Sequence, residues 1–155
     1  MNTEQTPITG NEDQQGLPEP IQAVSEFYAA FNHRDLEKMA NHWAQTDQIV
    51  MDNPVGGIKR GWAEIKAVYE RLFNGKARVY VEFYDYTIHQ QEDMFYVVGR
   101  ERGELRLGEK IIQLAFRTSR IFQRIDGRWR QVHHHGSIDE PELLARYQQA
   151  VRENT

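Results

Sequence analysis

Residues 126–137 read Asp-Gly-Arg-Trp-Arg-Gln-Val-His-His-His-Gly-Ser, and this stretch decides the fold. Asp-Gly is a strong signal for a tight hairpin turn, and the residues after it form an extended segment that ends at Gly-Ser. Successive side chains of a strand point to opposite faces. Strict alternation therefore predicts one face with Trp129, Gln131, His133, His135 and Ser137, and the other with Arg130, Val132, His134 and Gly136. Neither face has the composition of a plain core, which predicts a partner surface on one side and a polar pocket on the other.

Length and composition indicate one globular domain. A chain of 155 residues with 39% hydrophobic side chains can bury a core. The net charge of -4 argues against nucleic-acid or anionic-membrane partners. Because the chain has no cysteine, disulfides, thiolate catalysis and cysteine-ligated zinc are excluded. No stretch has the roughly 18 apolar residues of a membrane helix, and residues 1–16 do not form a secretory signal, so we expect a cytoplasmic protein.

The order of elements predicts an α+β fold. Residues 1–17 have the polar composition of a disordered tail, ahead of a single domain that spans 18–155. Apolar spacing and capping residues predict three helices, at 20–31, 35–43 and 61–73, and a terminal helix after Pro141. Strand formers predict a short strand at 48–51 and long ones at 78–89, 94–105, 110–125 and 128–137. Helices followed by long antiparallel strands imply a curved, cone-shaped sheet packed on the N-terminal helices, with a pocket at its open end.

Arginines interrupt the apolar rows of two predicted strands. In residues 110–125 the even positions are the more apolar, and Arg120 lies among them; in the preceding strand Tyr96 leads to Arg100 in the same way. A guanidinium among apolar neighbours needs a partner or a wet cavity. Arg100 and Arg120 with His134 would form a cationic hole for a carboxylate or another small anion. The alternative is that each arginine pairs with an internal acid such as Asp52, Asp85 or Glu82.

The opposite faces of the same strands predict an interface between protein subunits. Gln113, Ala115, Arg117 and Ser119 form a mixed row beside the strand of the three histidines. A merely solvated face is the alternative, and a tryptophan on it argues against that. We expect a homodimer or higher homo-oligomer whose interface includes Trp129, Gln131, His133, His135 and Arg117.

Metal and catalytic chemistry have weaker signals. His133 and His135 could bind zinc from one face, but no matching segment supplies the remaining ligands, so no metal is expected. No phosphate-binding glycine loop or serine elbow occurs, and no cofactor is expected. Asp52 ends a strand before Asn53 and is a candidate general base. The alternative is that Asp52 belongs to a strand-ending turn without any function.

With these residues in view, the chain resembles the SnoaL-like branch of the nuclear-transport-factor-2-like superfamily, from about Ile21 to Ser137. Residues 127–137 are similar to the closing strand of that branch, Trp-x-x-x-His-x-His-x-Ser. They look most like the association (hub) domain of calcium/calmodulin-dependent protein kinase. Residues 31–37, Phe-Asn-His-Arg-Asp-Leu-Glu, resemble its inter-helix turn, and residues 61–72 resemble its third helix.

The resemblance implies roles for several residues. Arg120 would fall on a hub pocket arginine and Arg100 on another strand arginine, whereas hub domains have an arginine where this chain has Gly136. Steroid isomerases of the same superfamily use an Asp-Pro-Val-Gly turn whose aspartate is the base. Here Asn53 takes that place, and Asp52 is one residue out of register and on the opposite face. The isomerase tyrosine would fall near Phe27 or Tyr28.

Together these features predict a domain that binds a small, anionic ligand or acts as an oligomerisation module. The predicted ligand-binding residues are Arg100, Arg120, His134, Tyr96, Tyr28 and Asn53. The alternative is a metal-free isomerase, cyclase or dehydratase that acts on a ketone- or polyketide-like substrate, with Asp52 or His134 as the base.

Overall fold

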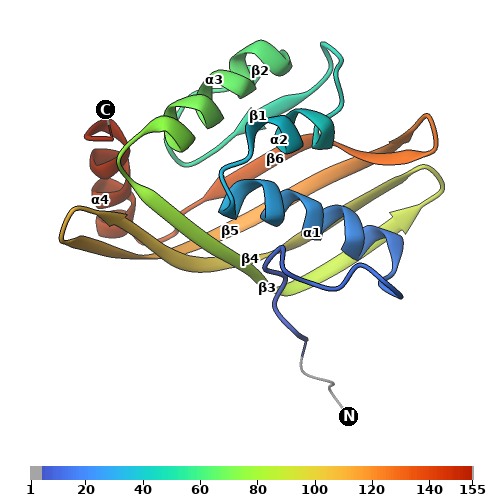
Figure 1. Ribbon diagram of the computed structural model, residues 1–155, viewed down its shortest axis with the longest axis horizontal. Helices are drawn as coiled ribbons and strands as arrows, with labels where there is room; N and C mark the ends of the chain where they lie inside the picture. Colours follow the sequence, from blue (N-terminus) through green and yellow to red (C-terminus); the bar gives the residue numbers. More distant parts are fainter. Residues whose placement is uncertain (1–4, 155) are drawn as a thin grey trace.

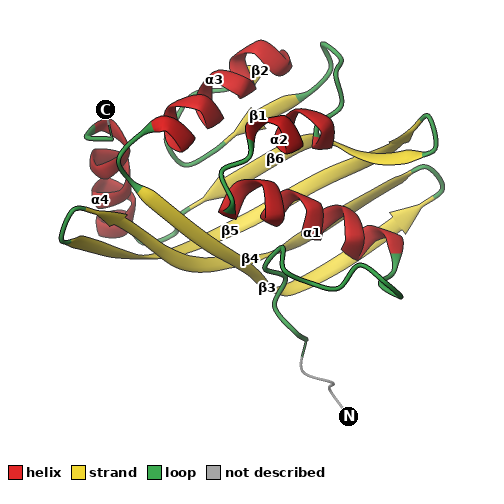
Figure 2. Cartoon of the chain, in the orientation of Figure 1, coloured by secondary structure: helices red, strands yellow, loops and turns green. Residues whose placement is uncertain are grey.

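The computed structural model describes residues 5–154 and confirms the α+β class, with a curved six-stranded sheet packed against N-terminal helices (Figures 1 and 2). The helices are α1 Glu19–Asn32, α2 Leu36–His42, α3 Gly61–Asn74 and α4 Pro141–Arg152. The strands are β1 Val50–Asp52, β2 Lys59–Arg60, β3 Arg78–Gln91, β4 Met94–Leu107, β5 Lys110–Ile125 and β6 Arg128–Ser137. None of the described helices is long and apolar enough to cross a membrane.

The sheet has the order β2-β1-β6-β5-β4-β3, and helices α1, α2 and α3 lie over one of its faces (Figure 1). Strands β3 to β6 form the predicted antiparallel series. The short β1 pairs in parallel with β6, so that Met51 lies opposite His134, and it pairs antiparallel with the unpredicted β2. This pairing brings the turn at Asn53 beside the end of the histidine strand.

Capping residues fix where two of the helices begin. The Asp35 side chain accepts a hydrogen bond from the Lys38 backbone N–H at the start of α2, as the sequence predicts. Glu140 caps α4 in the same way, with bonds from the backbone of Glu142 and Leu143. Helix α4 packs at one end of the sheet, away from α1 (Figure 1).

A β-bulge in β6 changes which of its side chains face inward. Ile121 pairs with His133, but the next residue of β5, Phe122, pairs with Gln131, so Val132 is an extra residue. The bulge places Trp129, Gln131 and His134 all on the inner face, where all three are buried. The prediction that Trp129 and Gln131 share the outer face with the other histidines is therefore wrong, because it assumed unbroken alternation.

Strand β4 presents its odd-numbered residues to the interior, contrary to the sequence prediction. Phe95, Val97 and Leu105 are fully buried, and pairing of Val97 with the inward Arg120 sets this register. Tyr96 is 39% exposed on the outer face. Arg100 lies on the same outer face, with its Nε 3.4 Å from the Asp85 carboxylate. Both residues are thus removed from the predicted pocket.

The segment before α1 packs onto the sheet. Ile8 is 2% exposed, and it exchanges two backbone hydrogen bonds with Phe83 of β3, of 2.8 and 2.9 Å. Gly10 has φ +93°, and a Cβ there would lie 2.3 Å from the backbone nitrogen of Ala29 in α1. Within residues 5–17 the structure therefore differs from the disordered tail that composition indicates, because one isoleucine and one glycine fit against the domain. Residues 1–4 of that predicted tail lie outside the described residues.

Candidate functional site

An inner cavity lies between the sheet and the helices, with about 70 Å³ of volume that the centre of a water molecule can reach. Helices α1 and α3 supply its apolar wall, strands β4, β5 and β6 supply its polar floor, and Tyr147 of α4 closes one end. Its polar lining residues are Asn53, Tyr69, Glu101, Thr118, Arg120 and His134.

Arg120 is the centre of the polar floor and is 1% exposed. Its Nη2 lies 3.5 Å from Oε1 of Glu101, which is also buried. The Thr118 hydroxyl donates a hydrogen bond to the same carboxylate oxygen. The acid that pairs with Arg120 is therefore Glu101, whereas Asp85, one of the three acids considered, pairs with Arg100 on the outer face. The inward row of β4 could have revealed it, because Glu101 lies at even spacing from Phe95, Val97 and Leu105.

A chain of buried polar groups leads away from Arg120. Its Nη1 donates to Gln131 Oε1 at 2.9 Å, and the Gln131 amide nitrogen lies 2.9 Å from His42 Nε2. Because the Gln131 oxygen accepts from arginine, its NH₂ group must donate, so His42 Nε2 accepts and its proton is on Nδ1. Burial, together with Arg120, lowers the pKa of His42 to about 3. The guanidinium also stacks on Phe27, 3.6 Å from the ring centroid.

His134 lines the cavity beside Arg120, which it pairs with across β5 and β6. It is 9% exposed, and neither of its ring nitrogens has a hydrogen-bond partner among the described residues. Burial and then the Arg120 charge hold the pKa of His134 well below 6.5, so the ring is neutral at pH 7. A neutral imidazole carries one donor and one acceptor. His134 therefore has one donor and one acceptor that no described residue satisfies.

Gly136 keeps space open next to His134. A Cβ at this position would lie 3.2 Å from His134 Nε2 and 3.3 Å from Pro54 Cδ. Gly136 also lines the cavity, so a side chain at this position would crowd His134 and the Pro54 ring.

The other predicted pocket residues lie in three different environments. Asn53 lines the cavity, with its Oδ1 accepting a hydrogen bond from the Val55 backbone. Tyr28 is fully buried but stacks on Phe83 behind the cavity and is not part of its lining. Asp52 lies outside the cavity, which removes it as a base for a cavity ligand.

Asp52 instead forms a hydrogen bond with one outward histidine, His135, and lies near a second, His133. Its Oδ2 lies 2.5 Å from His135 Nδ1, and its Oδ1 lies 3.8 Å from His133 Nε2. The His133 Nδ1 bonds to the Val50 carbonyl at 3.0 Å. These contacts give the outward histidines structural partners on β1, and no group of three or more histidine, aspartate or glutamate side chains in residues 5–154 is arranged to hold a metal ion.

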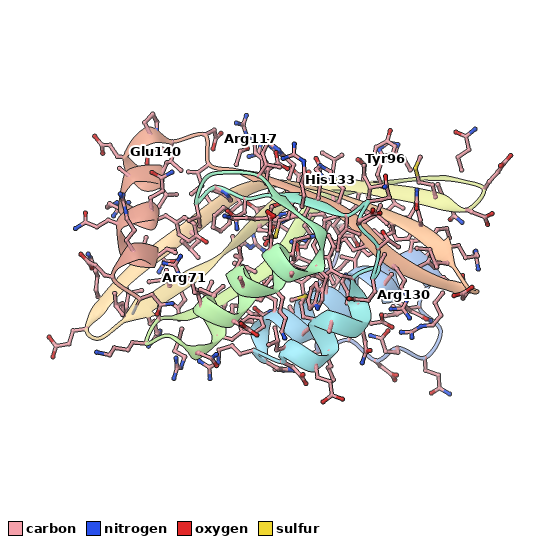
Figure 3. The ribbon with its side chains drawn as sticks, turned by 90° about the horizontal axis from the view of Figure 1, so that it is seen from above. Arg71, Tyr96, Arg117, Arg130, His133 and Glu140 are labelled. Carbon is pink, nitrogen blue, oxygen red and sulfur yellow. The ribbon has the colours of Figure 1, made fainter. Side chains whose placement is uncertain are left out.

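The outer face of the sheet carries exposed apolar side chains. Arg117, His133 and Tyr96 all project from the side of the sheet opposite the helices (Figure 3). Exposed large apolar residues accompany them: Met94, Val98 and Ile111 are 40%, 44% and 50% exposed. Of the predicted interface residues, the structure thus brings His133, His135 and Arg117 to this face, and places Trp129 and Gln131 inside.

Sequence comparison finds a curated relative, the F-box protein SKIP8 of Arabidopsis thaliana, which is 24% identical over 139 residues. The match covers 86% of this chain and 55% of the relative, so the chain spans about half the length of that protein.

Solved structures with the same fold are numerous. A Thiobacillus denitrificans protein that is named as a proposed calcium/calmodulin-dependent protein kinase type II association domain is 28% identical, with a TM-score of 0.61 over 78% of this chain and 95% of that one. A Xanthomonas campestris protein with a similar name is 18% identical, with a TM-score of 0.67 over 83% and 94%. A Streptomyces avermitilis protein that is named as a proposed dehydratase of the NTF2-like family is 19% identical, with a TM-score of 0.67 over 77% and 92%.

The last two of these likenesses show the fold alone, and they agree with the sheet and helix arrangement described above. The sequence pattern of the SnoaL-like domain matches residues 21–140, most of the chain. This protein therefore belongs to the SnoaL-like domain family.

Proposed function

We propose that the inner cavity binds a small, uncharged polar molecule that has both a hydrogen-bond donor and an acceptor. The observation that carries this proposal is His134, a buried neutral imidazole that lines the cavity with both ring nitrogens unpartnered among the described residues. Buried polar groups without partners cost free energy. A ligand that forms a hydrogen bond with one of these nitrogens would recover part of that cost.

The charge balance of the cavity favours an uncharged ligand over the anion that the sequence predicts. Arg100 is on the outer face, Arg120 is paired with Glu101, and His134 is neutral at pH 7. One cation and one anion leave the lining without net charge. An anionic ligand would meet the Glu101 carboxylate as well as Arg120, and desolvating its charge would not be offset.

The size of the cavity restricts the ligand. One water molecule needs roughly 10–15 Å³ of this kind of volume, so about 70 Å³ holds on the order of five waters. Propanamide has a comparable number of non-hydrogen atoms, and its amide group is a neutral donor and acceptor. Propanoate has nearly the same shape and carries a negative charge, which makes it a matched probe.

The test is a calorimetric titration of the full chain with propanamide and with propanoate at neutral pH. We expect propanamide to bind more tightly, and His134→Leu to weaken it at least tenfold, while His89→Leu on the exposed edge leaves it unchanged. Tighter binding of propanoate would overturn the uncharged class, and propanamide binding that is unaffected by His134→Leu would overturn the site.

An enzymatic role is the alternative that this cavity leaves available. His134 is neutral at pH 7 and could accept a proton from a bound ketone, which is the role of a general base. Such an isomerase, cyclase or dehydratase would release a changed molecule. Incubating the protein with a candidate ketone in D₂O and following deuterium exchange by NMR separates the two: exchange that is lost in His134→Leu supports the base.

We also propose that the outer face of the sheet forms a homodimer, in keeping with the association-domain names of two structural neighbours. Its exposed apolar side chains on β4 and β5 support this, since such patches mark interaction sites. A cytoplasmic location is a further proposal, which rests on sequence composition alone.

A further inference from the structure

We infer that the inner cavity is the head-group site of a longer pocket, and that its outer chamber binds an acidic group through Lys59 and Arg71. The ligand class is then an extended molecule with an uncharged polar head, an apolar middle and a carboxylate at the far end. This inference rests on the proposed function and names the chemistry of the ligand more fully.

The outer chamber is a second hollow next to the first, with about 320 Å³ of volume that the centre of a water molecule can reach. It lies between α3, α4 and the turn that joins β1 to β2. The two hollows share four lining residues: Asn53, Val68, Leu72 and Tyr147. The two hollows therefore adjoin one another across these four residues.

The shared wall is mostly apolar. Val68 and Leu72 come from successive turns of α3, and Tyr147 comes from α4, where its ring packs edge-on against Phe116 with centroids 5.2 Å apart. Gln148 donates a hydrogen bond to the Pro54 carbonyl at 3.0 Å, which holds α4 against the turn. A ligand that passes from one chamber to the other must present methylene groups to this wall.

Two cationic side chains line the outer chamber. Lys59 is half-buried, and Arg71 is exposed on the side of α3 that faces α4 (Figure 3). Within residues 5–154 neither side chain has a carboxylate within 4.0 Å.

The chamber's acid, Glu64, accepts a hydrogen bond from the Arg60 backbone at 3.1 Å. Asn154 also lines the chamber, but its side chain is bonded to Ala77 and to the Arg71 carbonyl. Two cations, Lys59 and Arg71, and one carboxylate, Glu64, leave the lining of the chamber with a net positive charge.

The experiment compares butanamide, hexanamide and octanamide with succinamic, adipamic and suberamic acids, which carry the same amide and an added terminal carboxylate. Calorimetric titration of the full chain at low salt gives each dissociation constant. We expect one chain length to bind about tenfold more tightly as the acid, which is about 1.4 kcal/mol, and this gain to shrink as salt is added.

Substitutions show which residues cause the tighter binding of the acid. Lys59→Gln with Arg71→Gln should remove the advantage of the acid and leave the simple amide unchanged. Lys66→Gln with Lys76→Gln removes the same charge outside the chamber and should preserve it. An acid that gains nothing at any length, or a gain that survives the Lys59 and Arg71 variants, overturns the outer site.

The simple amides report separately on the proposed function. If they bind in a manner that depends on His134 but the acids gain nothing, the head-group site stands and the outer site fails. If no simple amide binds while the acids bind through Lys59 and Arg71, the outer chamber holds anions by itself and the two-chamber pocket is wrong.

Discussion

At the scale of single residues, the pair formed by Glu101 and Arg120 determines what the cavity can hold. A buried ion pair is costly to break, because removing one partner leaves an uncompensated charge. Glu101 also accepts the Thr118 hydroxyl, and Arg120 also reaches Gln131 and stacks on Phe27. The pair is thus the point at which the polar floor and the aromatic wall of the cavity meet.

We predict that Glu101→Ala lowers the free energy of unfolding by about 3–5 kcal/mol, because Arg120 loses its carboxylate in a buried site. Adding Arg120→Met should cost less than a second such loss, since the unpaired charge is then gone. Urea unfolding of both variants measures this. Strict additivity, or a single-variant cost below about 1 kcal/mol, would contradict the pairing.

The two buried histidines make stability depend on pH. Burial lowers the pKa of His42 to about 3 and that of His134 well below 6.5. Unfolded histidines keep a pKa near 6.5, so below that pH the unfolded chain binds protons that the folded chain does not. The free energy of unfolding should therefore fall as pH drops below 6.5, by up to about 1.4 kcal/mol per pH unit for each histidine.

Urea unfolding from neutral pH down to about pH 5 measures this slope. His134→Gln should reduce the slope of the free energy of unfolding against pH by up to the contribution of one histidine. The control variant His89→Gln, on the exposed edge, should leave the slope as it is in the wild type. A slope that is the same in the His134 variant would show that this ring is not held neutral.

At the scale of elements, the sequence predicts most helices and strands but not every strand face. Residues 110–125 match β5, and their even-numbered side chains from Ile112 to Phe122 are buried as expected. In β6 the prediction of which side chains point inward fails at Val132, because a β-bulge adds one residue there. No residue type in the sequence marks the position of the bulge. In β4, Gly99 and Gly103 interrupt the buried odd-numbered row, and the exposed Tyr96 and Val98 are also apolar, so the sequence favours the even-numbered row and places Arg100 on the wrong face.

The sequence likewise predicts some residues of the candidate site and not others. Arg120, His134 and Asn53 could be predicted from strand alternation and turn position, and they do line one cavity. Lys59, Arg71 and Tyr147 could not, because only the packing of β2, α3 and α4 brings them together. The parallel pairing of β1 with β6 also lies outside local sequence signals, and it is this pairing that ties Asp52 to the outward histidines.

The N-terminal segment is an element that composition hides. We predict that Ile8→Ala lowers the free energy of unfolding by about 2–4 kcal/mol, as expected for a buried isoleucine. Thr6→Ala, at an exposed position of the same segment, should change it by less than about 0.5 kcal/mol. Chemical denaturation measures both, and equal small effects would mean that the segment does not pack on the domain.

At the scale of the whole molecule, the sheet separates two proposed functions, with the cavity on its inner face and the subunit interface on its outer face. We predict that Val98→Glu or His133→Glu converts the protein to monomers in sedimentation velocity, because each places an added charge on the outer face. The control variant Ala63→Glu, on the exposed side of α3, should have the same sedimentation coefficient as the wild type. A wild type that already sediments as a monomer contradicts the interface.

The central claim is that a neutral His134 meets the ligand inside the cavity, and NMR of its ring nitrogens tests this most directly. With ¹⁵N-labelled histidine in the full chain, the account predicts that propanamide shifts the His134 ring signals at neutral pH while those of the exposed His89 stay in place. It also predicts one protonated and one unprotonated nitrogen before the ligand is added. A His134 ring that is charged at neutral pH, or that does not respond to propanamide at saturation, would contradict the account.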